Sequence, residues 1–399
     1  MANTADPTRL TEASVRGILR GVLDPELHVN IVDLGMVRDV VIDPDGAVNI
    51  GIALTTAGCP MRAEIKREVQ SKVHGLPGVR DVHVSYSEMS QTEKSELMSR
   101  ARWEARQRAP QTGVAATTRV LAVASGKGGV GKSSVTVNLA AALAARGLAV
   151  GVLDADIWGF SVPRMLGVEG RLGGADGKIH PNAITVPGPN ELTPGRIDVV
   201  SMGFLVDRPE TALMWRGLVL ARAVEQFLVD VRWPDDLDYL LIDMPPGTGD
   251  IQMALARLLP QAEMVVVTTP ALAAQEVATR VADMAQRSYM KVAGVIENMS
   301  SFVAPDGTHH AIFGSGGGAA LAERIQVPLL GTIPIEPAVS AGGDSGMPVV
   351  LAAPDQPAAQ ALREIADDIV TRVLPPIDMA GCTARMLAAI EAALPPIER

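Results

Sequence analysis

The residues best suited to chemistry form a glycine-rich run, Gly126-Lys127-Gly128-Gly129-Val130-Gly131-Lys132-Ser133. It fits the pattern G-x-x-x-x-G-K-[ST], in which glycines let several backbone N–H groups point at a phosphate chain. A lysine in the position of Lys132 reaches the β- and γ-phosphates, and a hydroxyl in the position of Ser133 ligates Mg²⁺. Together with Ser134, this run is predicted to bind a nucleotide; the alternative is an ordinary glycine-rich turn.

Two acidic clusters follow apolar runs that read as strands. Asp243 ends the run LDYLLID, and Asp154-Ala155-Asp156 ends another. Carboxyl ends of parallel strands are where nucleotides bind in α/β sheets, so these carboxylates are expected beside the glycine-rich run. Asp243 is predicted to support the metal and Asp156 to position the attacking water. The alternative for both, and above all for Asp154, is a helix cap or a turn former.

The elements that must position these residues alternate along the chain. Apolar runs typical of buried strands are separated by helical stretches, which predicts a doubly wound, mostly parallel sheet of the α/β class. The predicted strands are 120–124, 149–154, 198–202, 239–243, 264–268, 292–297 and 328–332, and the predicted helices include 133–146, 251–259 and 275–286. Residues 167–190 are rich in Gly and Pro and are predicted to form a long excursion from the alternating strands and helices.

A small α+β unit is predicted to precede this domain. Residues 10–23 have helical spacing with Thr11 as N-cap, and strands 36–42, 47–54 and 79–84 surround a helix over 59–73. We divide the chain into residues 1–88 as the small unit, 89–117 as a charged helical linker with a flexible joint, 118–375 as the P-loop domain and 376–399 as a C-terminal helix and tail.

Composition narrows the classes of function. Of 399 residues, 47% are apolar and 20% charged, which excludes wholesale disorder. The net charge of −10 and the aromatic content of 3% argue against a nucleic-acid partner. No apolar run is long enough for a membrane span, and the stretch MANTADPTRLTEAS lacks the apolar core of a signal peptide. With only two cysteines, Cys59 and Cys382, a cytoplasmic protein without a membrane partner is predicted.

A second lysine in the loop, Lys127, is not needed for a simple phosphate cradle. The sequence GKGGVGKS resembles the deviant Walker motif of the MinD/ParA class of P-loop ATPases. In that class, the first lysine reaches the nucleotide of the partner subunit. The resemblance therefore implies that Lys127 acts in trans and that the protein is an ATP-dependent homodimer.

Further motifs resemble those of one branch within this class. DADIWGFSVPRMLG, IDMPPGTGD, GVIENMS, IFGSGGG and GGDSGMP, in this order, resemble the Mrp (ApbC/Nbp) branch of iron–sulfur cluster carrier ATPases over residues 119–350. This resemblance implies that Asn298 contacts the adenine, to which an amide is well matched; a buried turn-forming Asn is the alternative. The run 314–318 lacks a following lysine and is predicted to be a turn into a helix at Ala319.

Residues 8–88 resemble the small iron–sulfur assembly domain that is often fused to Mrp proteins. The resemblance rests on Asp24-Pro25-Glu26, on residues 31–35 (IVDLG) and on residues 55–60 (TTAGCP). Cys59 precedes a proline at a predicted helix start, where N–H donors and the helix dipole favour the thiolate. Cys59 is thus a candidate cluster ligand, and a small buried hydrophobe is the alternative.

The sequence departs from this branch after Asn298. Many relatives carry a Cys-x-x-Cys pair there, which holds a cluster between two subunits, whereas this chain reads SSFVAPDGTHH. Neighbouring histidines on a strand would point to opposite faces, so His309 and His310 are read as part of an exposed polar turn. Cluster carriage is therefore implied by the family without its usual ligands.

These observations predict a slow, Mg²⁺-dependent ATPase that carries iron–sulfur clusters and delivers them to apoproteins. One alternative is a nucleotide-gated regulator or scaffold without a cluster. Another is a MinD/ParA-like positioning ATPase, which would need a basic tail or surface. Residues 377–399 carry three acidic and two basic residues, which argues against that alternative.

Overall fold

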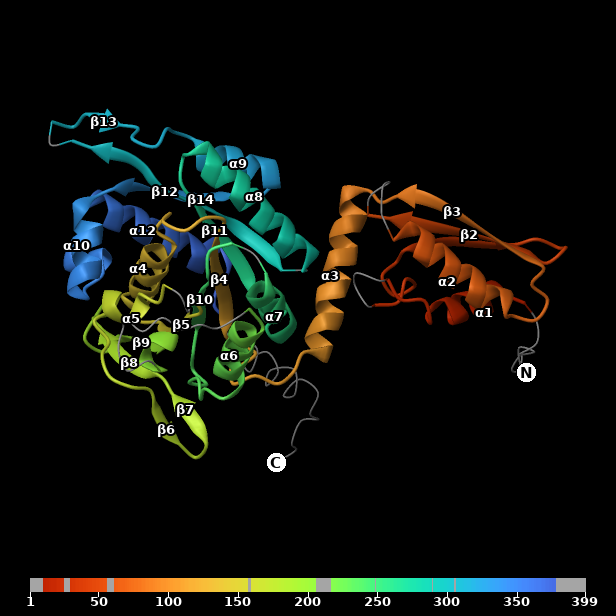
Figure 1. Ribbon diagram of the computed structural model, residues 1–399, viewed down its shortest axis with the longest axis horizontal. Coiled ribbons are helices and arrows are strands. Elements are labelled where there is room, and N and C mark those ends of the chain that lie inside the picture. The colour runs from red at the N-terminus through yellow and green to blue at the C-terminus, as the bar shows by residue number, and fades with distance from the viewer. Residues whose placement is uncertain are drawn as a thin grey trace, which may run out of the picture. The chain divides into compact units, whose positions relative to one another are not determined.

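The computed structural model describes residues 10–24, 29–55, 61–156, 159–205, 217–247, 249–288, 290–304 and 306–377. The chain divides into two compact units, Met1–Arg108 and Ala109–Arg399, which are described separately (Figure 1).

The first unit is a three-stranded sheet with helices. Strands β1 (Val37–Ile42) and β2 (Ala47–Leu54) form an antiparallel hairpin, and β3 (Asp81–Glu88) runs parallel to β2 after helix α2 (Arg62–His74). Helix α1 (Glu12–Leu19) begins at the predicted cap: Thr11 and Ser14 exchange side-chain and backbone hydrogen bonds in a capping box. The apolar faces of α1 and α2 supply the core, with Val15, Leu19, Ile65 and Val69 buried.

The segment predicted as a linker contains helix α3 (Gln91–Arg108), which counts with the first unit rather than between the two. Leu97 and Ala101 of α3 are buried, Arg38 of β1 pairs with Glu93, and Lys94 pairs with Glu88 at 3.0 Å. These contacts tie the helix to the small sheet. The first unit therefore extends twenty residues beyond the boundary predicted at 88, since its last residue is Arg108.

The second unit is built on a nine-stranded, mostly parallel sheet, which confirms the predicted fold class. Seven strands run parallel in the spatial order β14, β12, β11, β4, β10, β5 and β9. Their bounds are Leu329–Ile335, Lys291–Val303, Glu263–Thr268, Arg119–Ser125, Tyr239–Asp243, Ala149–Asp154 and Gly195–Ser201. Strand order reverses around β4, and such switch points create a crevice at the carboxyl ends of the strands.

Two antiparallel strands complete the sheet. β8 (Asn182–Val186) pairs with β9 at one edge, and the short β13 (His309–His310) pairs with the far end of β12. The predicted excursion over 167–190 thus supplies an edge strand, together with a separate hairpin of β6 (Gly173–Ala175) and β7 (Lys178–His180). His309 and His310 are exposed as expected, but they lie in a strand rather than a turn.

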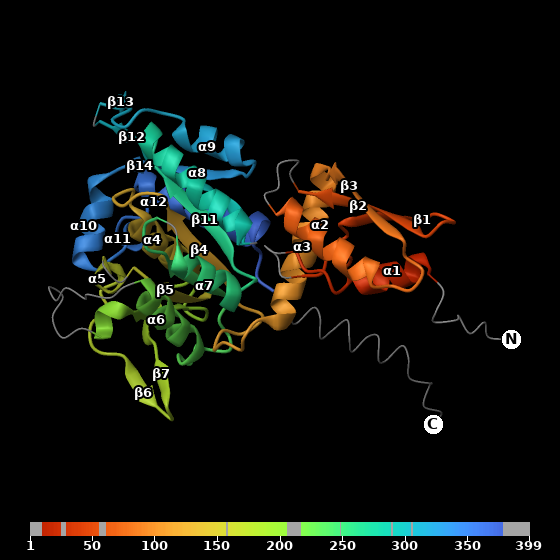
Figure 2. The same cartoon turned by 45° about the vertical axis from the view of Figure 1, so that its right-hand side comes forward.

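Helices cover both faces of the sheet (Figures 1 and 2). Along β4, Leu121 and Val123 pack in one core with helices α4, α11 and α12, while Val120 and Ala122 pack in the other with α6, α7, α8 and α9. The helix bounds are Lys132–Ala144 (α4), Val162–Met165 (α5), Gly217–Val229 (α6), Asp250–Leu258 (α7), Leu272–Arg287 (α8), Gly317–Ile325 (α9), Pro337–Ser345 (α10), Val349–Ala352 (α11) and Pro357–Asp368 (α12).

Two short helical turns, η1 (Met202–Leu205) and η2 (Ile369–Val373), follow β9 and α12. The helix predicted within the tail at 376–399 falls almost wholly outside the described residues, which end at 377. In the described part of the chain, we find no helix that combines the length and apolarity needed to cross a bilayer.

Candidate nucleotide-binding site

The glycine-rich run Gly126–Ser133 connects β4 to α4, as predicted. Gly129 and Gly131 have φ angles of +81° and +82°, a left-handed conformation that L side chains rarely adopt, and Gly131 is the N-cap of α4. A Cβ atom added to Gly128 would meet no heavy atom within 4 Å. The run is therefore curled and open on its inner side, and the N-terminus of α4 points into that space.

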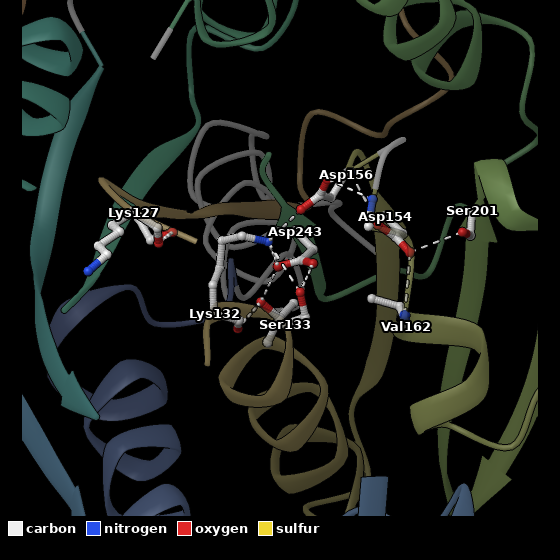
Figure 3. A network of polar contacts seen from close by, with 11 residues as sticks. Lys127, Lys132, Ser133, Asp154, Asp156, Val162, Ser201 and Asp243 are labelled. Carbon is white, nitrogen blue, oxygen red and sulfur yellow. Dashed lines mark hydrogen bonds and ion pairs between the residues drawn. The ribbon is translucent and has the colours of Figure 1, made fainter. Parts of the chain in front are cut away.

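The predicted lysine, serine and aspartate meet in one network (Figure 3). Lys132 Nζ lies 2.7 Å from Oδ1 of Asp243, and the Ser133 hydroxyl donates to Oδ2 of the same carboxylate at 2.6 Å. The Thr136 hydroxyl lies 3.0 Å from Oδ1. Asp243 is fully buried, so these three groups provide the polar partners that its charge requires.

Thr136 is a member of this network that the sequence did not single out. It lies one helical turn after Lys132, a spacing that places both side chains on the face of α4 toward β10. That spacing was the available signal, but a threonine inside a helix is too common to be distinctive.

Asp154 and Asp243 are register partners on adjacent parallel strands, and Ser201 is the partner of Asp154 on the next strand. The Ser201 hydroxyl and the backbone N–H of Val162 both donate to Oδ2 of Asp154, at 3.0 Å and 3.4 Å. Burial, reinforced by the negative charge of Asp243, raises the pKa of Asp154 to about 7. Asp154 is thus a buried acceptor, and its Oδ1 also accepts the backbone N–H of Asp156 at 3.2 Å, which is the contact of a turn former.

Asp156 lies at the rim. Its Oδ2 is 3.8 Å from Lys132 Nζ, and its Oδ1 accepts the backbone N–H of Gly159 at 3.2 Å. The structure therefore brings Asp156, Asp243 and Lys132 together, as the sequence predicted.

Lys132, Ser133 and Asp156 line an open cavity of about 270 Å³. Its walls come from the glycine-rich run, from the loop after β5 with α5, and from the loop after β10. The lining residues are Ser125, Lys127, Gly128, Gly129, Gly131, Lys132, Ser133, Ser134, Asp156, Gly159, Ser161, Met165 and Pro246. Lys127 is exposed, and its side chain points away from Lys132 (Figure 3).

The wall of the cavity that contains α5 is supported by α10. Met165 of α5 lies in that wall, and α5 packs on α10: Arg164 Nη2 is 2.6 Å from Oδ1 of Asp344. Just after α5, Gly167 approaches Gly346 so closely that a Cβ atom on Gly346 would lie 2.7 Å from the Cα of Gly167. The GGDSGMP motif therefore supports the wall formed by α5, and its own residues do not line the cavity.

Asn298, predicted to contact adenine, lies next to the glycine-rich run. Its side chain is 9% exposed, and Nδ2 donates to the backbone carbonyl of Val130 at 2.9 Å. The neighbouring Met299 has a φ of +57°. Contact with a base stays a prediction.

The second glycine run, 314–318, is a turn into a helix as predicted, although the helix begins at Gly317 rather than at Ala319. Its inner side is filled: a Cβ atom on Gly317 would lie 2.5 Å from Gln275 Nε2, and one on Gly318 would lie 2.6 Å from Glu297 Cβ. The Glu297 carboxylate also accepts the backbone N–H of Gly318. The start of this helix, at Gly317 and Gly318, is therefore occupied by side chains of the protein itself.

The candidate cluster ligand Cys59 and the other cysteine, Cys382, lie outside the described residues. Among the side chains that the structure describes, no group of three or more His, Cys, Asp or Glu residues is arranged to hold a metal ion.

Two family models match the chain. Residues 116–370 match the model of the NUBPL iron-transfer P-loop NTPases, and residues 12–86 match that of an iron–sulfur cluster assembly protein. The two matches fall on the second and first units respectively, and they confirm the resemblance found in the sequence.

Full-length relatives agree. The chain is 47% identical over 367 residues to a protein of Mycobacterium tuberculosis (strain ATCC 25618 / H37Rv) named iron–sulfur cluster carrier protein, covering 90% of this chain and 93% of the relative. A protein of the same name from Synechocystis sp. is 41% identical, with 91% of this chain and 98% of the relative covered.

Among solved structures, the chain is similar to a nucleotide-binding protein from Archaeoglobus fulgidus in complex with ADP. The identity is 33% and the TM-score 0.47, covering 61% of this chain and 91% of the other. The Pyrococcus furiosus cell division ATPase MinD aligns at 23% identity and a TM-score of 0.46, covering 63% of this chain and 98% of the other.

Proposed function

Because the chain belongs to the family of NUBPL iron-transfer P-loop NTPases, we propose that it binds and slowly hydrolyses ATP with Mg²⁺ and uses that cycle to carry iron–sulfur clusters to apoproteins. The observation that carries the proposal is the joint attachment of Lys132 and Ser133 to the buried carboxylate of Asp243, beneath an open glycine cradle.

The charges around the cavity fit a magnesium nucleotide. The carboxylates of Asp156 and Asp243 lie 3.8 Å and 2.7 Å from the buried ammonium of Lys132, and the carboxylate of Asp154 is buried beside Asp243. Buried carboxylates require compensation, which a divalent cation supplies when it enters with the phosphates. Mg²⁺ takes most of its ligands from phosphates and water, so the Ser133 hydroxyl and Asp243 suffice from the protein. When bound, Mg²⁺ would neutralise charge on the phosphate oxygens.

The residues then take separate roles in hydrolysis. Backbone N–H groups of residues 126–134 bind the phosphate chain, and Lys132 exchanges its contact with Asp243 for the β- and γ-phosphates. Asp156, at the rim of the cavity, orients the attacking water. Asn298 is proposed to face the adenine with the amide atoms that Val130 does not use.

Lys127 is proposed to act on the partner's nucleotide in a homodimer. Its exposure and its direction away from Lys132 support that role, because a lysine so placed does not serve the nucleotide of its own subunit. Dimerisation upon ATP binding would therefore complete two sites at once.

Mixing two inactive variants tests the trans role. Lys127→Ala and Lys132→Ala should each abolish hydrolysis, yet a heterodimer of the two contains one site with both lysines intact. Phosphate release should therefore return on mixing, to at most about half of the wild-type rate if the two sites act independently. Failure of the mixture to recover any activity would contradict the shared site.

The cargo is proposed to be an iron–sulfur cluster held at a dimer, with Cys59 as candidate ligand. Relatives named iron–sulfur cluster carriers support the cargo, although this chain has only two cysteines. Two copies of Cys59 and Cys382 would supply the four thiolates that a [4Fe–4S] cluster ordinarily takes. Anaerobic reconstitution with iron and sulfide should give charge-transfer absorption that Cys59→Ala loses, and transfer to an apoprotein should follow.

A nucleotide-gated regulator or scaffold without a cluster is the second candidate function. The absence of the Cys-x-x-Cys pair from the chain after Asn298 favours it. A reconstituted wild-type protein that binds ATP but holds neither iron nor sulfide would establish this alternative over cluster carriage. We expect either activity in the cytoplasm, without a membrane or nucleic-acid partner.

A further inference from the structure

We propose that Asn298 is a positioning residue that holds the phosphate-binding loop in its curled form, whether or not a base is bound. The proposal rests on the proposed nucleotide binding and assigns to Asn298 a role that contact with adenine does not require.

The hydrogen bond from Asn298 has a direct geometric consequence. Nδ2 lies 2.9 Å from the carbonyl oxygen of Val130, and both residues are buried. Because a trans peptide unit is planar, the carbonyl of Val130 and the N–H of Gly131 point in opposite directions. Among the described residues, Gly131 and Lys132 line the cavity, whereas Asn298 and Val130 do not. A bond that holds the carbonyl outward therefore holds the Gly131 N–H toward the phosphates.

Asn298 and Gly131 lie so close together that no side chain fits at position 131. A Cβ atom at position 131 would overlap Asn298 Nδ2, so only glycine leaves room for the amide. The Met299 side chain lies on the same glycine, with Cε 3.7 Å from that position. Asn298 thus reaches the loop from a strand far along the chain.

The backbone of β12 is strained where Asn298 lies. Met299 has a φ of +57°, a left-handed conformation uncommon for a residue with a side chain, and the pairing of β12 with β14 shifts register between Asn298 and Phe302. Such outliers persist where the surrounding structure over-determines them, and they cluster at functional sites. The irregularity directs Asn298 and Met299 together onto Gly131.

Hydrogen exchange of the ligand-free protein tests the proposal without any nucleotide. Asn298→Leu keeps the volume and removes the donor, and Asn298→Ala removes the side chain. In both, amides of residues 126–136 should exchange faster than in wild type, while β10 and α12 keep their protection. Gln252→Leu is the matched control. It also removes a buried amide, whose Nε2 donates to the Val281 carbonyl at 3.4 Å, but this residue does not line the cavity. Unchanged exchange over 126–136 in both Asn298 variants would overturn the proposal.

Binding of Mg²⁺ with inorganic tripolyphosphate, a phosphate chain without a base, gives a second readout. Loss of one backbone-directed hydrogen bond should weaken both tripolyphosphate and ATP by about three- to tenfold in Asn298→Leu. A further loss confined to ATP would add adenine contact to the positioning role. Weakened ATP binding with unchanged tripolyphosphate binding would contradict positioning. Wild-type protein that binds neither ligand would instead refute the proposed nucleotide binding.

Discussion

Two glycine-rich turns of the second unit begin in the same way and end differently. Each leads into a helix whose N-cap is a left-handed glycine: Gly131 before α4, with φ of +82°, and Gly316 before α9, with φ of +72°. After Gly131 come Lys132 and Ser133 beside an open cavity, whereas after Gly316 the backbone is packed against Glu297 and Gln275.

The difference lies in what satisfies the helix N-terminus. In the second turn, the Glu297 carboxylate already accepts the N–H of Gly318, so the protein itself supplies the anion that a helix start attracts. In the first turn, no carboxylate is within reach of the inner N–H groups among the contacts that the described residues make, and Lys132 adds a positive charge. Glycines therefore leave open space in one turn and allow close packing in the other.

The largest expected effect on ATP hydrolysis is that of removing Lys132, which has no counterpart in the second turn. Lys132→Ala should lower ATP hydrolysis at least about a hundredfold, since the charge that stabilises the transferred phosphoryl group is lost. Phosphate release and calorimetric binding of Mg-ATP measure this. As a control, adding Ala319→Lys to the second turn of that variant should restore nothing, because its inner space is filled; recovery of ATP binding there would break the comparison.

Alanine at one glycine of each turn should produce opposite phenotypes. Gly318→Ala places a Cβ atom 2.6 Å from Glu297 Cβ and should cost about 1 to 3 kcal/mol of unfolding free energy, with nucleotide affinity retained. Gly128→Ala meets nothing within 4 Å and should leave stability unchanged, yet weaken Mg-ATP about tenfold by filling the cradle. Denaturant titration and calorimetry on both variants separate the two effects, and identical phenotypes would refute the distinction.

A smaller effect concerns the carboxylate beneath the first turn. Burial and the charge of Asp243 raise the pKa of Asp154 to about 7, while Lys132 opposes that rise. In the unfolded chain this group ionises near 4, so the stability it contributes is complete below about pH 4 and is lost as the pH rises to about 7. Asp154→Asn should remove this loss, so the stability of the variant relative to wild type should be higher at pH 8 than at pH 5.

Urea denaturation of the ligand-free proteins between pH 4.5 and 8 measures that difference. Asparagine keeps an acceptor for the Val162 N–H, which limits structural change at the site. The assignment fails if wild type and variant lose stability in parallel across this range.

Much of the site was predictable because its signals are local. The glycine-rich run identifies itself by spacing, and Asp156 and Asp243 were placed beside it because parallel strands end at one edge of a sheet. The core strands were predictable for a similar reason, since strands buried on both faces read as continuous apolar runs; 149–154 and 239–243 match β5 and β10 residue for residue.

What escaped prediction depends on contacts distant in sequence. Helix α3 was not predicted to pack, because most of its residues are charged or polar, although Leu97 and Ala101 are buried. Edge strand β8 was not predicted because it lies in a segment rich in Gly and Pro. It becomes a strand by pairing with β9, which the local sequence does not indicate. The reach of Asn298 to Val130 depends on the left-handed Met299, and nothing in a methionine signals such a backbone.

Gly167 and Gly346 are far apart in sequence but lie so close together that the residue type at one position restricts the residue type at the other. A methyl group added to either one meets the backbone of the other, so a tolerated change at one site would require an accommodating shift at its counterpart. Because Gly167 follows shortly after α5, and Met165 of α5 lines the cavity, a substitution at position 346 would affect the cavity indirectly. Substitutions at the C-cap of α10 can therefore alter the shape of the cavity wall, although Gly346 is not one of the residues that line the cavity.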